Sequence, residues 1–224
     1  MLESQFPPDV AARIEACGVV SVLVIDDAQH AVPLAKALLD GGIDAMELTL
    51  RTPAAIEALQ LIRKNVPEML AGIGTILTKQ QIGDVVEAGA RFGVAPGLNA
   101  NIVTEAQRLG LPFAPGIATP SDVELAIELG CRELKFFPAE PSGGLGYLKS
   151  LAAPYAHLGI RYVPLGGVNL TNLPAYMSDP NVMAVGGSWL APRADINKQD
   201  WQTITDRAAE ARRVTDAARE GKST

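Results

Sequence analysis

Basic residues, cysteines, histidines and long apolar runs are all scarce in this sequence, and each shortage excludes a class of protein. The 224 residues include 19 Lys and Arg against 25 Asp and Glu, a net charge of −6, whereas nucleic-acid binding needs a basic surface. No apolar run approaches the roughly 20 residues of a membrane-spanning helix. The first residues lack the basic and apolar regions of a secretory signal. We therefore expect a cytoplasmic protein with no nucleic-acid and no membrane partner.

The cysteines and histidines fall in no pattern that serves chemistry. Cys17 and Cys131 belong to no CxxC or Cys/His cluster, and we expect both to be small buried hydrophobes in a reducing compartment. His30 and His157 are far apart and stand in no metal-ligand spacing. No Ser/His/Asp arrangement stands out either. The sequence therefore predicts neither a metal site nor a disulfide.

A regular alternation of short apolar segments and amphipathic segments runs along the chain. The run "VVSVLVI" (19–25) is typical of a strand buried on both faces. A segment with helical spacing that ends on glycines follows it, and the pattern repeats. The predicted strands are 19–25, 43–50, 69–74, 92–96, 112–116, 132–138, 160–167 and 182–187. The predicted helices are 27–42, 53–65, 78–90, 99–110, 119–130, 144–154, 170–178 and 200–220.

Eight strand–helix units of short period indicate an α/β protein with a parallel sheet. Eight such units favour a single closed (β/α)8 TIM barrel, with one domain over 1–224. An extra N-terminal helix near Asp9–Cys17 is predicted to cover the N-terminal side of the strands. The alternative is a doubly wound open sheet, but no GxGxxG motif follows the first strand.

A barrel has its active site at the carboxyl ends of its strands, so the inward residues there are the candidates. Side chains alternate along a strand, and Glu47, Thr49 and Arg51 therefore share the face that points into the barrel. A glutamate and an arginine on one strand face are consistent with an internal ion pair or with catalysis.

The stretch "RELKFFPAE" (132–140) places a lysine within an apolar strand. By the same alternation Glu133, Lys135 and Phe137 point inward. Burial disfavours the ammonium form of a lysine, and a neutral amine attacks a ketone to form a Schiff base. Glu47, from another strand, would then be the base. The alternative is that Lys135 is the buried ion-pair partner of Glu47 or Glu133.

Glycines end the last two predicted strands, in "PLGGVN" (164–169) and "VGGSWL" (185–190). Backbone N–H groups at such a place form an anion site, which in barrels often holds phosphate. Ser188 adds a hydroxyl donor. The segments "GIGT" (72–75) and "APGL" (95–98) either bring backbone close to a ligand or form tight turns.

These motifs resemble, in order and spacing, the class I aldolases that cleave 2-keto-3-deoxy-6-phosphogluconate (KDPG), often described jointly with 4-hydroxy-2-oxoglutarate (KHG) aldolase. The similarity runs from about residue 11 to residue 209, and "ELTLRT" with "KFFPAE" is its most specific part. The resemblance implies a (β/α)8 barrel, usually a homotrimer, without a metal or an organic cofactor. It also implies an aldehyde-lyase that cleaves KDPG to pyruvate and glyceraldehyde 3-phosphate through a lysine Schiff base.

The resemblance also assigns roles to single residues. Lys135 matches the Schiff-base lysine and Glu47 the general acid/base. The other matching positions are Arg51 and Thr75 for the carboxylate of the pyruvate part, Pro96 and Phe137 for the pocket wall, and Gly166, Gly167 and Ser188 for the phosphate.

One residue departs from the family pattern. Leu165 stands where typical members have a threonine that reaches the substrate. Loss of that hydroxyl is expected to relax selectivity at the carbon it recognises, which would favour the galactonate-derived epimer or KHG. A phosphate-binding isomerase and a non-catalytic sugar-phosphate binder remain the more remote alternatives.

Overall fold

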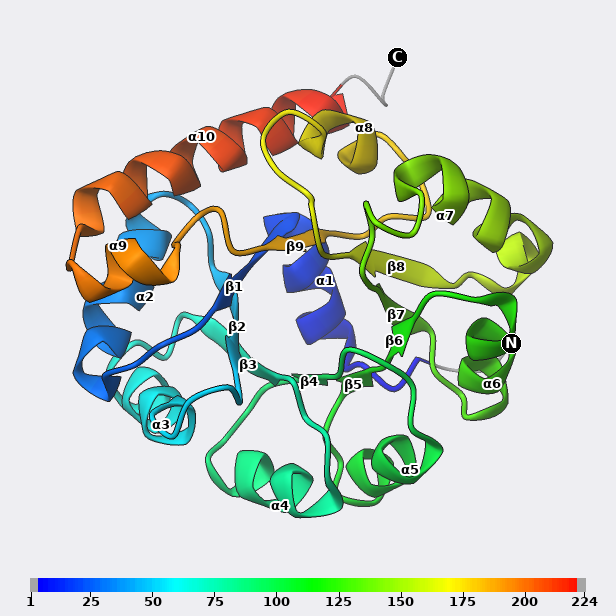
Figure 1. Cartoon of the computed structure of the whole chain (residues 1–224), viewed down its shortest axis with the longest axis horizontal. Coiled ribbons are helices and arrows are strands. Elements are labelled where there is room, and N and C mark those ends of the chain that lie inside the picture. The colour runs from blue at the N-terminus through cyan, green and yellow to red at the C-terminus, as the bar shows by residue number, and fades with distance from the viewer. Residues whose placement is uncertain (1–3, 221–224) are drawn as a thin grey trace.

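The structure, a computed structural model, describes residues 4–220, and the other residues of the predicted domain 1–224 lie outside the described part. It has an α/β fold in which parallel strands curve around the centre of the molecule and helices surround them (Figure 1). One sheet has the order β5-β4-β3-β2-β1-β9 and the other the order β6-β7-β8. The strands are β1 (Val19–Leu23), β2 (Ala45–Thr49), β3 (Leu70–Gly74), β4 (Gly93–Val94), β5 (Phe113–Ala114), β6 (Gly116–Ile117), β7 (Glu133–Phe136), β8 (Arg161–Pro164) and β9 (Val185–Gly187).

Helices follow the strands in the order that the sequence pattern predicts. They are α2 (Ala31–Asp40), α3 (Ala55–Asn65), α4 (Lys79–Glu87), α5 (Ala100–Arg108), α6 (Pro120–Glu128), α7 (Gly144–Ala152), α8 (Leu173–Met177), α9 (Arg193–Asn197) and α10 (Trp201–Glu220). Local signals fix several starts: Thr78 and Gln81 form a capping box at α4, as Thr119 and Asp122 do at α6. The alternation and the parallel pairing are thus confirmed.

Several predicted segments differ in detail. The predicted helix 27–42 divides into a 3₁₀ turn, η1 (Ala28–His30), and α2, because the Asp27 side chain accepts a hydrogen bond from the N–H of Gln29. The predicted helix 170–178 shrinks to α8. Asn169 and Asn172 bond to nearby backbone groups there, and such bonds compete with a helix. A second 3₁₀ segment, η2 (Ala153–Leu158), extends α7, and α9 was not predicted.

The two sheets adjoin at two places along the chain. The predicted strand 112–116 divides into β5 and β6 at Pro115, which has no N–H for the ladder but accepts a hydrogen bond from Lys135 N over 3.0 Å. On the other side, single parallel bridges join Tyr162 to Val182 and Leu165 to Gly186. Because neighbouring strands are parallel, their carboxyl ends lie on one side of the molecule.

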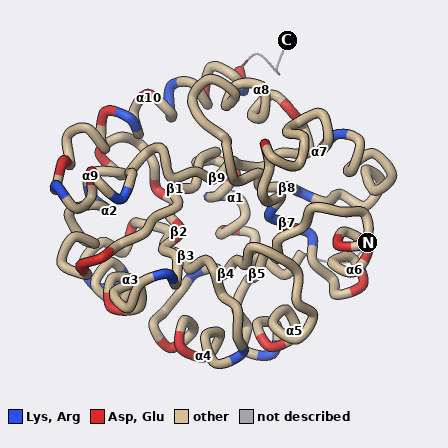
Figure 2. The backbone as a smooth tube through the Cα atoms, in the orientation of Figure 1, with Lys and Arg blue, Asp and Glu red and all other residues tan. Residues whose placement is uncertain are grey.

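The predicted N-terminal helix is present as α1 (Pro8–Cys17). It crosses the N-terminal side of the strands near the centre of the ring (Figure 1), and its residue Ile14 is buried there. Charged residues lie mostly on the outer helices (Figure 2). None of the helices within residues 4–220 is both long enough and apolar enough to cross a membrane.

Candidate active site

A buried ion pair joins the two sheets at the centre of the ring. Lys135 on β7 approaches Glu47 on β2, with distances of 3.1 and 3.3 Å from Nζ to Oε1 and Oε2. The side chains are only 8% and 3% exposed. A buried lysine and carboxylate remain charged only when paired in this way. The alternation along the strands therefore predicted the inward orientation of both side chains correctly. The sequence left either Glu47 or Glu133 as the ion-pair partner of Lys135, and in the structure the partner is Glu47.

Gly74 on β3 provides the space for the Glu47 carboxylate. A Cβ atom built on Gly74 would approach Oε1 of Glu47 to well under 3.0 Å, a separation that real Cβ atoms do not show. The register pairs Thr49 with Gly74 and Glu47 with Gly72. The absence of a side chain at Gly74 thus allows the carboxylate to turn toward Lys135.

An open pocket of 210 Å³ begins at this pair. Eight of the nine residues predicted for the site line it, namely Glu47, Arg51, Thr75, Pro96, Lys135, Phe137, Gly166 and Ser188. The Phe137 ring centroid lies 5.6 Å from Lys135 Nζ, a distance that favours a cation on the nitrogen. A lysine with no role beyond its ion pair would not need to face an open pocket.

Gly167 is the predicted residue that does not line this pocket. Its carbonyl accepts hydrogen bonds from the side chains of Asn169 and Asn172 over 3.1 and 3.2 Å. A Cβ at Gly167 would press on the Glu140 side chain. The glycine is thus needed to close the turn after β8.

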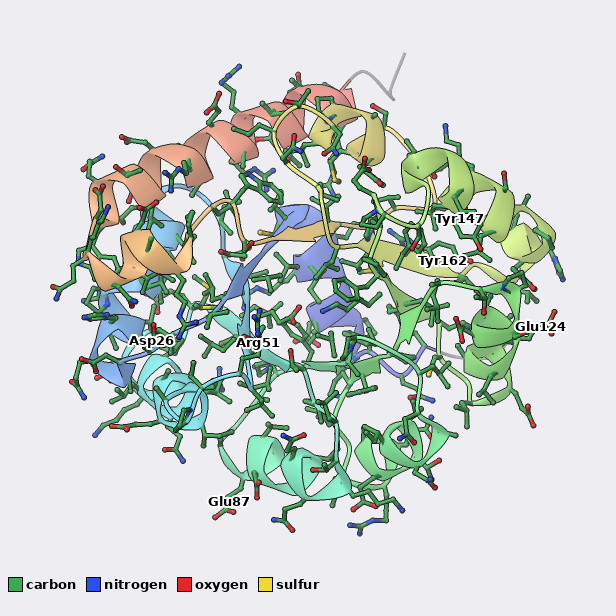
Figure 3. The ribbon with its side chains drawn as sticks, in the orientation of Figure 1. Asp26, Arg51, Glu87, Glu124, Tyr147 and Tyr162 are labelled. Carbon is green, nitrogen blue, oxygen red and sulfur yellow. The ribbon has the colours of Figure 1, made fainter. Side chains whose placement is uncertain are left out.

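Arg51 and Thr75 lie where β2 and β3 end. The Arg51 side chain is exposed, has no hydrogen bond or ion pair with any residue of the described chain, and lies inside the ring of helices (Figure 3). It is therefore free to bind an anion. Thr75 has a φ of 61°, a left-handed conformation that costs about 1 kcal/mol or more in a non-glycine residue. Such strain is concentrated at ligand sites.

The opposite end of the pocket consists largely of glycine backbone. Gly166, Gly186 and Gly187 line it together with the exposed Ser188. Gly166 has a φ of 94°, and a Cβ there would meet Pro138 and the Phe137 ring at 3.2 and 3.3 Å. Close access to backbone N–H groups and a serine hydroxyl is the chemistry of an anion site.

Asp26 ties the segment after β1 to α9, beyond Ser188. The Arg193 guanidinium donates to both Asp26 oxygens over 2.8 and 2.5 Å, and Asn197 adds a bond over 2.9 Å. These donors, Arg193 first, lower the pKa of Asp26 to about 2. In Figure 3, Asp26 lies farther from the centre of the ring than Arg51.

Val22, Val24 and Leu165 form an apolar wall of the pocket. Sequence reasoning did not assign the two valines to the site, because a strand that is apolar throughout gives no alternation from which to choose the inward face. Leu165 packs over Gly186, where a Cβ would lie 2.5 Å from its Cγ.

The cysteines take no part in this site. Both are buried and unpaired, and burial is the main cause that raises the pKa of Cys17 to about 11 and that of Cys131 to about 12. They are therefore thiols of low reactivity. Residues 4–220 contain no group of three or more His, Cys, Asp or Glu side chains that could hold a metal ion.

The sequence and the fold match those of known aldolases. A family model for KDPG and KHG aldolases matches residues 10–207. The 2-dehydro-3-deoxy-phosphogluconate aldolase of Dickeya dadantii is 44% identical over 193 residues, which make up 86% of this chain and 90% of that protein.

Two solved structures are similar over most of their length. KDPG aldolase from Legionella pneumophila, with pyruvate captured at low pH as a covalent carbinolamine, gives a TM-score of 0.86 at 39% identity, covering 90% of this chain and 97% of that one. The Zymomonas mobilis enzyme with 3-phosphoglycerate gives a TM-score of 0.83 at 40% identity, covering 91% and 94%.

Proposed function

The chain belongs to the KDPG and KHG aldolase family, and from this membership and the pocket we propose that it cleaves KDPG to pyruvate and glyceraldehyde 3-phosphate. It is thus a carbon–carbon lyase of the class I type. One observation supports the proposal above all. The amine of Lys135 faces an open pocket from a buried position and lies 3.1 Å from a carboxylate that can exchange protons with it.

The first half of the proposed reaction forms the Schiff base. Glu47 takes a proton from the Lys135 ammonium, and the free amine attacks the C2 ketone of the substrate. Glu47 passes that proton to the C2 oxygen and takes a second proton from the nitrogen, which gives the carbinolamine. It then passes the second proton to the C2 hydroxyl, which leaves as water. The resulting iminium carries the positive charge that withdraws electrons from the C3–C4 bond.

The second half breaks the carbon–carbon bond. Glu47 accepts the proton of the C4 hydroxyl, directly or through one water. The C3–C4 bonding pair moves into the iminium, which becomes a neutral enamine, and glyceraldehyde 3-phosphate leaves. Glu47 then returns a proton to C3. Water adds at C2, and pyruvate departs while the lysine is restored.

Groups at the two ends of the pocket would hold the substrate. We assign the pyruvate carboxylate to Arg51 and Thr75, with Pro96 and Phe137 as walls. The phosphate would bind at Gly166 and Ser188. Gly167 would contribute only through the backbone turn that it closes after β8. Binding at both ends fixes the reacting carbons between Lys135 and Glu47.

We also propose that the two sheets close into one (β/α)8 barrel within a single domain. The bridges from β8 to the β9 segment and the continuity of the chain through Pro115 support this closure. A homotrimeric, cytoplasmic enzyme agrees with the family resemblance. No metal or organic cofactor is required, because the Lys135 iminium is itself the electron sink.

Borohydride trapping tests the proposed function. We expect incubation with pyruvate and sodium borohydride to attach a reduced pyruvate to Lys135, located by peptide mass spectrometry. The matched control is Lys149→Met, which removes an exposed lysine paired with Asp179 at 3.6 Å and should label like the parent. A folded protein with no adduct at saturating pyruvate would leave the isomerase or binder alternative.

The apolar side chain of Leu165 favours a second candidate substrate. This is either KHG or the galactonate-derived compound, which is the C4 epimer of KDPG. We expect Leu165→Thr to raise the ratio of kcat/KM for KDPG over its C4 epimer by about tenfold, because one hydroxyl contact contributes about 1 kcal/mol or more. Leu165→Val has nearly the same shape as the threonine variant but no hydroxyl. Equal ratios in these two variants would show that the hydroxyl has no role in selectivity.

A further inference from the structure

A small cavity of 30 Å³ lies beneath the Lys135–Glu47 pair, on the side away from the open pocket. Its walls are almost entirely apolar, and Ile14 of α1 and Phe6 close it from the N-terminal side. Besides the ion pair, the only charged side chain that lines the cavity among residues 4–220 is Glu133.

Glu133 begins β7, two residues before Lys135, and therefore shares its inward face. The residue is 6% exposed. Its two carboxylate oxygens accept from the Ser4 hydroxyl, each over 2.8 Å. Arg161 lies opposite it in the register of β8, but the Arg161 guanidinium is paired with Glu15. The proposed chemistry does not use this acid.

The surroundings of Glu133 have opposing effects on its charge. Burial is the largest influence and leaves the pKa of Glu133 raised, although the Ser4 hydroxyl, a backbone hydrogen bond, Arg161 and Arg132 lower it in part. Cys131, two residues before Glu133 and outside β7, has a pKa raised by burial and remains a neutral thiol. The charged groups across the cavity are Lys135 and Glu47, and Arg51 lies farther out in the open pocket. Lys135 is thus the cation that shares an enclosed space with Glu133.

We propose that Glu133 is a positioning residue that acts on the reaction through Lys135, stabilising its cationic forms across the apolar cavity. The inference rests on the proposed function, since it concerns the lysine that forms the Schiff base. An apolar, enclosed space screens charge far less than water does. The negative charge therefore favours the ammonium before the reaction and the iminium during it. It disfavours the neutral amine and the neutral enamine.

The sign of this effect determines how the rate of Schiff-base formation depends on pH. Schiff-base formation requires the neutral amine and rises with pH as the ammonium loses its proton. A carboxylate that stabilises the ammonium moves this rise to higher pH. Removal of the Glu133 charge should therefore move the midpoint of this rise in rate to lower pH, by about one unit for a single nearby charge.

The experiment measures the initial rate of borohydride trapping by pyruvate against pH. Glu133→Gln keeps an oxygen that accepts from Ser4 but removes the charge, whereas Ser4→Ala keeps the charge and removes the donor. We expect the midpoint to fall by about one pH unit in Glu133→Gln and by less than half as much in Ser4→Ala. Both variants should lose some thermal stability.

Each result has a defined meaning. Glu133→Gln with the parental midpoint would overturn the inference and leave Glu133 as an anchor for Ser4. If that variant does not fold, Glu133→Met removes the charge without adding a polar group to the cavity, and the same shift is required of it. No trapping in the parent at any pH would instead refute the proposed function, so the two failures are distinguishable.

Discussion

We expect the variant Lys135→Met to lose turnover by about 10⁵-fold or more, the scale seen when an enzyme loses its covalent nucleophile. Methionine is close to lysine in volume, although one atom shorter, and it cannot attack a ketone. Steady-state assays that couple pyruvate release to a dehydrogenase would measure the loss. Parental turnover in this variant would exclude the Schiff-base mechanism.

The same variant should also be less stable, because it leaves the Glu47 carboxylate buried without its partner. Breaking a buried ion pair on one side costs about 3–5 kcal/mol. We expect the double variant Lys135→Met/Glu47→Leu to regain most of this free energy of unfolding while remaining inactive. Denaturant unfolding of both variants gives the two values. A single variant as stable as the parent would contradict the burial of the pair.

Gly74→Ala is expected to have the second largest effect. The new methyl group would occupy the position of the Glu47 carboxylate, so the carboxylate must turn away from Lys135. Displacing a catalytic group by about 1 Å can cost 10²-fold in rate, and overpacking of a core costs about 1–3 kcal/mol. We expect both losses, measured as kcat and as the free energy of unfolding.

Gly83→Ala is the matched control for this substitution. Gly83 lies within α4, and a Cβ built there meets no atom within 4 Å. Alanine in a helix interior is favoured over glycine by about 1 kcal/mol. The control should therefore be slightly more stable and fully active. Equal behaviour of the two alanine variants would mean that Gly74 does not provide the space for Glu47.

The sequence predicted those features that depend on short-range periodicity. Side-chain alternation along a strand is such a local feature, and it correctly predicted that Lys135 and Glu47 point inward. Features that depend on distant segments were not predictable. That Gly74 accommodates the Glu47 carboxylate requires the register of β2 with β3. That Phe6 and α1 enclose a cavity beneath Lys135 requires the whole ring.

Local side-chain chemistry accounts for other differences. Asn169 and Asn172 delay the start of α8 through bonds to the backbone. Pro115 interrupts a strand that apolar character alone predicted to be continuous. The sequence therefore predicted those parts of the candidate site that depend on side-chain alternation within a single strand.

The ion pair spans the two sheets, with Glu47 in the first and Lys135 in the second, and this has a consequence for the chain during its synthesis. Translation produces Glu47, Arg51, Thr75 and Pro96 well before Lys135, the proposed nucleophile. A nascent chain that ends after β6 therefore carries the proposed acid/base, Glu47, but not the lysine that we propose as the nucleophile. Lys135 gains its partner only when β7 docks, and the anion site waits for Gly166 and Ser188. Catalytic competence is thus among the last properties that the growing polypeptide acquires.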